Sequence, residues 1–224
     1  VGSLADASVF SLHPVKAIAA GEGGAITTDD HALAEQLRRF RNHGMDHDQR
    51  SRADARTWHY SVVEEGYNYR LSDIHCALAR SQLRKLQKWV ARRQAIATIY
   101  DEGFRDLPSM VPLSRHPGRT HAYHLYVVRC RVSDTGENRR DKLFDLMRAE
   151  AIGVNVHYAP VYYHPVYRQR GYKKGLCPTT ERVCEEILSL PIFPSMTDGD
   201  AFRVIDKVSQ SMELIEKNGL ATSD

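Results

Sequence analysis

The sequence has few cysteines, no long apolar run and little excess charge, and each of these shortages argues against a class of protein. Its four cysteines include no Cys-x-x-Cys pair, so neither a zinc knuckle nor a redox motif is indicated, and reduced thiols in a cytoplasmic protein are expected. No apolar stretch is long enough to cross a bilayer. The net charge of +3 comes from interspersed basic and acidic residues, which favours neither nucleic acid nor a membrane as a partner.

Two local clusters bear on whether the chain binds nucleic acid or a metal ion. Residues 38–41, Arg-Arg-Phe-Arg, are typical of a cationic helix end, where positive charge complements the helix dipole, although they leave open a nucleic-acid-binding module. His43 and His47 have the four-residue spacing of a helical metal site. Gly44 between them is expected to break that helix, so no metal is predicted.

One lysine lies between an apolar run and a glycine-rich turn. Lys16 follows residues 7–11, which have the composition of a short buried strand, and precedes Gly-Glu-Gly-Gly at residues 21–24. Pro14 prevents a helix from forming across the lysine. Most lysines are solvated loop residues, but one desolvated at a strand end can lose its proton and form a Schiff base. The Ser11 hydroxyl and the glycine N–H groups suit a phosphate.

Two further runs carry candidate ligand-binding residues. Residues 66–74, Gly-Tyr-Asn-Tyr-Arg-Leu-Ser-Asp-Ile, place Asn68 and Arg70 just before a long helical pattern. Amide and guanidinium donors suit a phosphate dianion, although such a cluster is also ordinary turn and capping chemistry. Residues 156–162, Val-His-Tyr-Ala-Pro-Val-Tyr, form either a packed aromatic loop or the lining of a ligand pocket.

These three runs together resemble the DegT/DnrJ/EryC1/StrS family of pyridoxal-phosphate sugar aminotransferases, and the resemblance covers nearly the whole chain. The family usually has Phe where this chain has Leu12, an apolar change that does not touch the chemistry. The resemblance implies an α/β fold of the aspartate-aminotransferase type (PLP fold type I). Residues 1–104 would be the end of the large αβα domain with a long interdomain helix, and residues 105–224 the small C-terminal α/β domain.

The resemblance also implies that the chain is the C-terminal part of a longer enzyme, because in the family a long segment precedes the cofactor lysine. That segment would carry the aspartate that pairs with the pyridinium nitrogen and the aromatic ring that stacks on the cofactor. By resemblance, Lys16 is the catalytic lysine that binds pyridoxal 5'-phosphate, and Ser11, Asn68 and Arg70 also bind this cofactor. Asn68 and Arg70 would reach the cofactor phosphate of the neighbouring subunit, in a homodimer with shared active sites.

The same resemblance places His13, His157 and Tyr158 on the substrate side, although His13 is equally able to satisfy backbone groups beside the cofactor. The implied substrate is a keto sugar carried on a nucleotide, with glutamate as the amino donor. A family subgroup with histidine in place of the lysine performs dehydration, so the presence of Lys16 favours transamination. The alternative is a noncatalytic or truncated relative that acts as a dimerising or binding module.

Periodicity and capping residues give a coarse map of the elements, and the expected helix caps are Asp29 or Asp30, Ser72 and Asn138. The polar residues 45–65 are expected to form a long surface loop. Residues 105–224 are expected to form a small sheet covered on one side by helices. Strands are predicted at 7–11, 25–28, 124–132 and 154–158, and helices at 31–43, 73–104, 138–151, 180–188 and 198–218.

Overall fold

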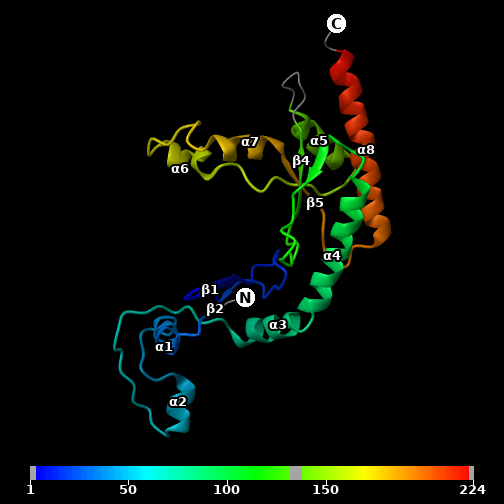
Figure 1. Cartoon of the computed structure of the whole chain (residues 1–224). Coiled ribbons are helices and arrows are strands. Elements are labelled where there is room, and N and C mark those ends of the chain that lie inside the picture. Colours follow the sequence, from blue (N-terminus) through cyan, green and yellow to red (C-terminus); the bar gives the residue numbers. More distant parts are fainter. Residues whose placement is uncertain (1–3, 132–137, 222–224) are drawn as a thin grey trace. The chain divides into compact units, whose positions relative to one another are not determined.

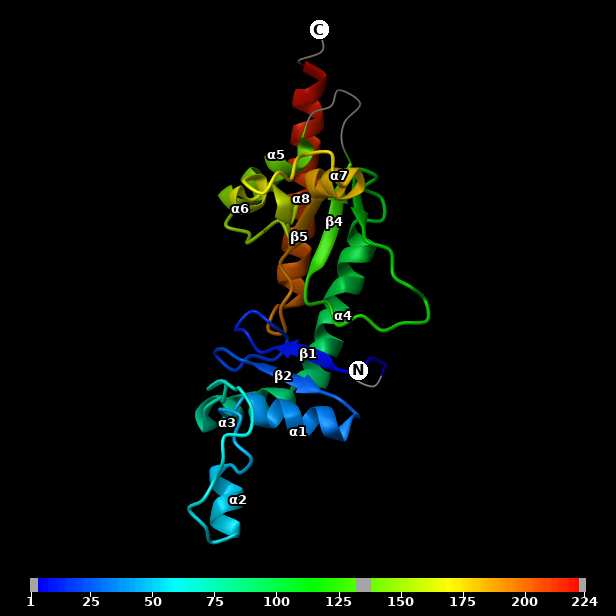
Figure 2. The same ribbon diagram turned by 90° about the vertical axis from the view of Figure 1, so that its left-hand side faces the viewer.

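The computed structural model describes residues 4–131 and 138–221. The chain folds into two compact units, Val1–Leu86 and Gln87–Asp224, each of which combines strands and helices (Figures 1 and 2).

The first unit begins with the two short strands that the sequence predicts. Strands β1 (Ser8–Ser11) and β2 (Gly24–Thr27) pair in antiparallel fashion, with Ser8 opposite Thr27 and Ser11 opposite Gly24. The expectation that the first strand is buried was wrong. Val9 on β1 is 77% exposed, because no apolar side chains of the described residues pack over it.

Helix α1 (His31–Phe40) starts directly after the expected cap Asp30 but ends earlier than expected. The Asp30 carboxylate accepts a hydrogen bond from the Leu33 N–H at 3.1 Å, which satisfies one of the free amides of the first turn. The helix ends at Phe40 instead of His43, because the chain turns after Arg41 and has a left-handed backbone at His43 and Gly44.

The stretch expected to be an open loop contains a short helix, α2 (Gln49–Asp54). Its cap is Asp48, whose carboxylate accepts a hydrogen bond from the Ser51 N–H at 2.8 Å. This expectation was wrong because α2 has no apolar stripe, so periodicity gives no signal for it.

The single long helix predicted for residues 73–104 is two helices. Helix α3 (Asp73–Leu83) starts at the predicted cap Ser72, and α4 (Leu86–Gly103) follows after a turn closed by the Lys85 N–H and the Gln82 carbonyl at 2.9 Å. No glycine or proline marks this break. The side chains that α4 buries belong to the core of the second unit, so α4 packs there.

The second unit contains a three-stranded antiparallel sheet in the order β3 (Met110–Pro112), β4 (Tyr126–Cys130), β5 (Ile187–Leu190). Strand β4 lies within the predicted strand, whose expected end at residue 132 is outside the described residues. Strand β5 corrects the helix predicted through residue 188, because its four side chains are all buried and the pattern of a fully buried strand is easily taken for a helix.

In the described part of the second unit, α4 and the sheet are accompanied by five helical segments: α5 (Arg139–Ala149), η1 (Val161–Tyr163), α6 (Pro165–Arg168), α7 (Pro178–Glu186) and α8 (Asp198–Ala221). Asn138 caps α5 as predicted, accepting a hydrogen bond from the Asp141 N–H at 3.2 Å. The strand predicted at residues 154–158 was wrong, since this segment makes only the isolated bridge between Asn155 and Ser189.

The hydrophobic core of the described chain lies entirely in the second unit. Helices α4 and α8 approach closely there, since a Cβ added at Gly103 would lie 2.5 Å from Ile205 Cδ1 (Figure 1). Among the described residues of the first unit, only Leu12 and Ala20 are buried apolar residues. The largest fully buried side chains are Tyr100, Phe104, Ile96, Met110, Leu143, Met147, Leu188, Met212, Val128, Val208 and Cys130.

A buried arginine ties α4 to two loops of the second unit. The Arg93 side chain is 6% exposed, and its guanidinium donates hydrogen bonds to the carbonyls of Tyr123 at 2.9 Å and Ile192 at 2.7 Å. Burial lowers the pKa of this guanidinium, since desolvation disfavours its charged form. Along the described residues, no helix combines the length and the apolarity needed to cross a lipid bilayer.

We expect the four thiols to differ sharply in reactivity. Burial raises the pKa of the Cys130 thiol to about 12, so it stays protonated and inert at pH 8, whereas Cys76 and Cys177 are exposed. With a chromogenic thiol reagent, Cys76 and Cys177 should react in the folded protein and Cys130 only on unfolding. Peptide mapping of the alkylated protein assigns each site, and Cys130→Ser should leave the fast phase unchanged. Rapid native labelling of Cys130 would contradict the core as described.

Candidate functional site

Lys16 lies in a closed turn that follows β1. The Leu12 N–H donates to the Gly23 carbonyl and the Ala20 N–H donates to the Leu12 carbonyl, both at 2.9 Å, so Leu12 is held at the base of the turn. The Lys16 N–H donates to the His13 carbonyl at 2.9 Å. Lys16 is partly buried. Backbone hydrogen bonds therefore present this amine from a defined turn.

Ser11 and His13 help to build the same turn. The His13 N–H donates to Ser11 Oγ at 3.3 Å, and the Val15 N–H donates to His13 Nδ1 at 3.4 Å. His13 Nε2 lies 3.6 Å from a carboxylate oxygen of Glu22. These contacts fit the alternative in which His13 satisfies backbone groups, and a substrate role for His13 stays a prediction.

The start of α3 packs against the glycines that follow the turn. Gly21 and Gly23 have φ angles of 83° and 138°, which side chains rarely adopt. A Cβ at Gly23 would lie 2.8 Å from Leu71 Cδ1, and one at Gly21 would lie 3.1 Å from His75 Cδ2. The motif of Lys16 is thus in contact with the segment that begins at Gly66.

Leu71 and His75 were not singled out by sequence reasoning. His75 Nδ1 lies 2.7 Å from Ser72 Oγ, which fixes the imidazole ring beside Gly21. The sequence signal for this contact is the pair Gly21 and Gly23, because such glycines indicate that another chain segment lies close by. They do not indicate which segment that is.

Asn68 and Arg70 lie in a segment whose backbone is hydrogen-bonded to the end of α1. The Tyr67 N–H donates to the Phe40 carbonyl at 2.7 Å, and the Tyr69 N–H donates to the Arg41 carbonyl at 2.9 Å. The rings of Tyr67 and Tyr69 stack at 4.9 Å between centroids. Residues 67–69 are thereby aligned along the end of α1.

This alignment leaves the two candidate phosphate ligands exposed. Asn68 forms a β-bridge with Asn42, and one terminal nitrogen of Arg70 donates to Asn42 Oδ1 at 2.8 Å. The Arg70 guanidinium is thus oriented by one hydrogen bond while most of its donors remain accessible. Such an arrangement is suited to binding an anion.

His157 and Tyr158 belong to the second unit. His157 Nδ1 lies 2.8 Å from the Ser189 hydroxyl on β5, so this ring is anchored to the sheet. The Tyr158 side chain is 71% exposed and meets the His157 ring edge to face at 4.6 Å between centroids. The structure therefore brings Ser11, His13 and Lys16 together in one turn, Asn68 and Arg70 in one segment, and His157 and Tyr158 in another.

The described residues contain no group of three or more His, Cys, Asp or Glu side chains that is close enough to hold a metal ion.

Residues 1–209 match the model of the DegT/DnrJ/EryC1/StrS aminotransferase family. The Bacillus subtilis spore coat polysaccharide biosynthesis protein SpsC is 37% identical over 210 residues, which are 93% of this chain and 54% of SpsC. The chain spans about half the length of the curated relatives it matches.

Several solved structures share the fold. Spr1654 from Streptococcus pneumoniae, described as a sugar aminotransferase, has a TM-score of 0.85 at 26% identity, over 96% of this chain and 55% of its own. Helicobacter pylori PseC, an aminotransferase involved in pseudoaminic acid biosynthesis, has a TM-score of 0.83 at 29% identity, over 95% of this chain and 55% of its own. The mixed α/β fold is therefore that of the fold type I aminotransferases, as the sequence predicted.

We expect Gly44→Ala to displace the segment that carries Asn68. An added Cβ would lie 1.8 Å from the Glu64 carbonyl oxygen, a backbone atom that cannot move without breaking the bond from the Val63 N–H to the Gly44 carbonyl. Hydrogen exchange at the Val63 and Tyr67 amides should accelerate at least about tenfold.

Gly171→Ala is the matched control, because Gly171 has a φ of 89° but no atom within 4 Å of an added Cβ. It carries the same kind of backbone strain without the collision. Unchanged exchange at the Val63 and Tyr67 amides in the Gly44→Ala protein, or acceleration there in the control, would contradict the close approach.

Proposed function

The chain belongs to the DegT/DnrJ/EryC1/StrS aminotransferase family, and on this premise we propose that it carries half of a nucleotide-sugar aminotransferase active site. The reaction is transfer of an amino group, with glutamate as donor, to the keto carbon of a nucleotide-linked sugar. The observation that carries the proposal is Lys16, a partly buried amine in a closed turn beside two left-handed glycines.

The donor set of the first unit fits pyridoxal 5'-phosphate, the cofactor of this family. Spr1654 is known in both its PLP and its PMP forms. In this chain Lys16 offers the amine that an aldehyde requires, while Ser11, Asn68 and Arg70 offer hydroxyl, amide and guanidinium donors for a phosphate. When bound, the cofactor supplies an electron sink for negative charge next to the reacting nitrogen.

Each residue then has a distinct task. The Lys16 amine holds the cofactor covalently and, once released, moves a proton at the α-carbon of the amino donor. Arg70, oriented by Asn42, and Asn68 bind the phosphate of a cofactor held in a second copy of the chain, which makes the enzyme a homodimer with shared sites. His157 and Tyr158 contact the sugar substrate.

The substrate we propose is a UDP-linked 4-keto-6-deoxy sugar of the pseudaminic acid pathway or of a related surface-glycan pathway. We infer this substrate from the three sequence motifs, which resemble those of the UDP-4-amino-4,6-dideoxy-N-acetyl-β-L-altrosamine transaminase. The likeness to PseC and to SpsC supports a glycan precursor as the substrate.

Covalent labelling tests the role of Lys16. Incubation with pyridoxal phosphate followed by borohydride reduction should place a stable label on the Lys16 peptide. Lys16→Ala in the complete gene product should abolish amino transfer while the circular dichroism spectrum is unchanged. Lys174→Ala, which removes an exposed lysine of the second unit, is the control and should keep full activity. No label, or label only elsewhere, would favour the noncatalytic relative that folds and dimerises without cofactor.

Mixed dimers test the shared site. We expect Arg70→Ala to weaken cofactor binding about tenfold or more, because a charge-assisted hydrogen bond to phosphate is lost. A dimer of one Lys16→Ala chain and one Arg70→Ala chain should then contain one intact site, with wild-type cofactor affinity. If Arg70 served the cofactor of its own chain, both sites would be defective and this dimer would bind no cofactor with wild-type affinity.

A further inference from the structure

The second unit holds a pocket of about 330 Å³ whose lining includes none of the residues proposed for the cofactor or the sugar. Its walls are Asp101 of α4, residues 113–115 after β3, and residues from the stretch 121–127, which leads into β4. The volume is within the range of small-molecule sites, about 300–1,000 Å³. We call it the Tyr123 pocket, after the residue on which its chemistry depends.

Tyr123 combines two features that stability does not explain. Its backbone φ is 48°, in the left-handed region that aromatic residues rarely adopt. Its side chain is 6% exposed, and the hydroxyl is shielded from solvent and has no hydrogen-bond partner among the described residues. Burial raises the pKa of this hydroxyl, so it keeps its proton and is a hydrogen-bond donor. A buried donor without a partner destabilises a fold, and phenylalanine would pack there without that cost.

The wall that carries Tyr123 is held in place by α4. The Arg93 guanidinium donates to the Tyr123 carbonyl at 2.9 Å, and Gln94 Nε2 donates to the His121 carbonyl at 3.0 Å. The rings of His121 and Tyr123 contact each other, with 4.4 Å between their centroids. This part of the pocket is therefore formed before any ligand arrives.

The polar groups of the pocket are mainly hydrogen-bond donors. His121 Nδ1 accepts a hydrogen bond from the Tyr123 N–H at 3.0 Å, so the proton of the neutral ring lies on Nε2, which can donate. The Arg115 guanidinium lies 5.9 Å from the centre of the Tyr123 ring. The Asp101 carboxylate is already engaged, since it accepts hydrogen bonds from the Tyr126 hydroxyl at 2.7 Å and from Arg115 at 2.5 Å.

We propose that the Tyr123 pocket binds a small organic carboxylate with an apolar body. An ionised carboxylate only accepts hydrogen bonds, so it matches the donors of Tyr123, Arg115 and His121. Leu113 and Leu125 line the pocket for the apolar body. The Arg115 side chain is 49% exposed, so it can turn outward as the ligand reaches the Tyr123 hydroxyl. This site does not depend on the proposed function, because none of its residues takes part in it.

Calorimetric titration of the complete gene product with benzoate and with its neutral analogue benzamide tests the site. Benzoate should bind with one site per chain, and benzamide should bind at least about tenfold more weakly, because its hydrogen bonds are not charge-assisted. Tyr123→Phe should weaken benzoate binding at least about fivefold. Without benzoate, the melting temperature of Tyr123→Phe should equal or exceed that of the wild type, because the hydroxyl that is removed has no partner to lose.

Two matched controls separate binding from folding. Tyr162→Phe removes a hydroxyl that donates to the Glu181 carboxylate at 2.7 Å, so it should lower the melting temperature and leave benzoate affinity unchanged. Arg115→Gln should weaken benzoate binding at least about tenfold, whereas Arg119→Gln should not, since Arg119 is an exposed arginine of the same loop outside the lining.

Several outcomes would overturn the proposal: no binding of benzoate, equal affinity for benzamide, unchanged affinity in the folded Tyr123→Phe protein, or the same loss in Arg119→Gln. A lower melting temperature of Tyr123→Phe without benzoate would also overturn it, because the hydroxyl would then already have a partner in the complete gene product. Glutamate bound as tightly as benzoate would contradict the apolar body of the ligand.

Discussion

The candidate site depends on close approaches between chain segments at four glycines, where an added side chain would collide or be strained. At Gly44 and Gly66 an added Cβ would lie within 2.2 Å of a backbone atom, so these positions admit no side chain without separation of the segments. At Gly21 and Gly23 the approaching groups are the side chains of His75 and Leu71. Through these contacts the turn of Lys16, the start of α3 and the end of α1 form one structure, and the segment with Asn68 and Arg70 acquires a defined course.

The two units are stabilised by different interactions. The second unit is organised around a continuous apolar core to which α4, the sheet, α5 and α8 all contribute, and apolar burial is the dominant favourable term in folding. The described part of the first unit is organised by backbone hydrogen bonds, helix caps and the glycine contacts, while side chains such as Val9, Ile74 and Leu83 remain exposed. Relatives about twice as long contain further polypeptide, and apolar faces of this kind are where additional protein would be expected to pack.

Sequence reasoning succeeded where a local rule is strong. Asp30, Ser72 and Asn138 cap the helices they were expected to cap, because a side-chain oxygen ahead of a helix satisfies free amides whatever the rest of the fold does. It failed where the deciding contact is distant in sequence, as at β5, whose buried residues belong to a strand only because β4 lies beside them. The residues proposed for the site were found through family motifs, whereas Leu71 and His75 were missed because packing against a glycine leaves no pattern at the packing residue itself.

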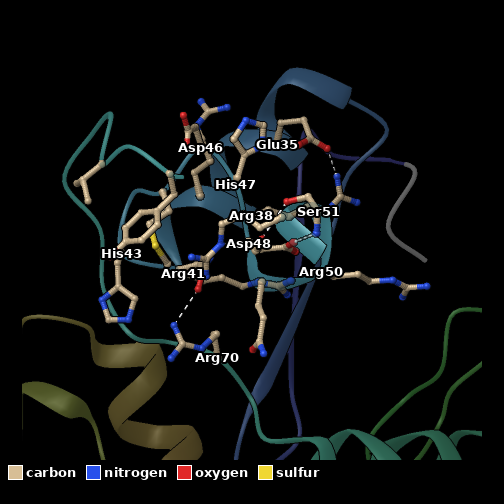
Figure 3. A pocket seen from close by; sticks show the side chains of 17 residues that line it. Glu35, Arg38, Arg41, His43, Asp46, His47, Asp48, Arg50, Ser51 and Arg70 are labelled. Carbon is tan, nitrogen blue, oxygen red and sulfur yellow. Dashed lines mark hydrogen bonds and ion pairs between the residues drawn. The ribbon is translucent and has the colours of Figure 1, made fainter. Parts of the chain in front are cut away.

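The basic run at residues 38–41 shows why composition alone gives an incomplete account of charge. A cationic helix end explains Arg38 and Arg39, which lie in the last turn of α1 and pair with Glu35 and Glu64. It does not explain Arg41, which follows the helix and has no such partner in the described chain. The Tyr69 N–H donates a hydrogen bond to the Arg41 carbonyl, and the Arg70 guanidinium donates one to the Asn42 side chain. Arg41 and Arg70, which are 29 residues apart in sequence, therefore line one pocket of the first unit beside α1 and α2 (Figure 3). The nearly balanced charge of the whole sequence conceals this concentration, because the nearby carboxylates pair with Arg38 and Arg39 or accept hydrogen bonds from backbone amides.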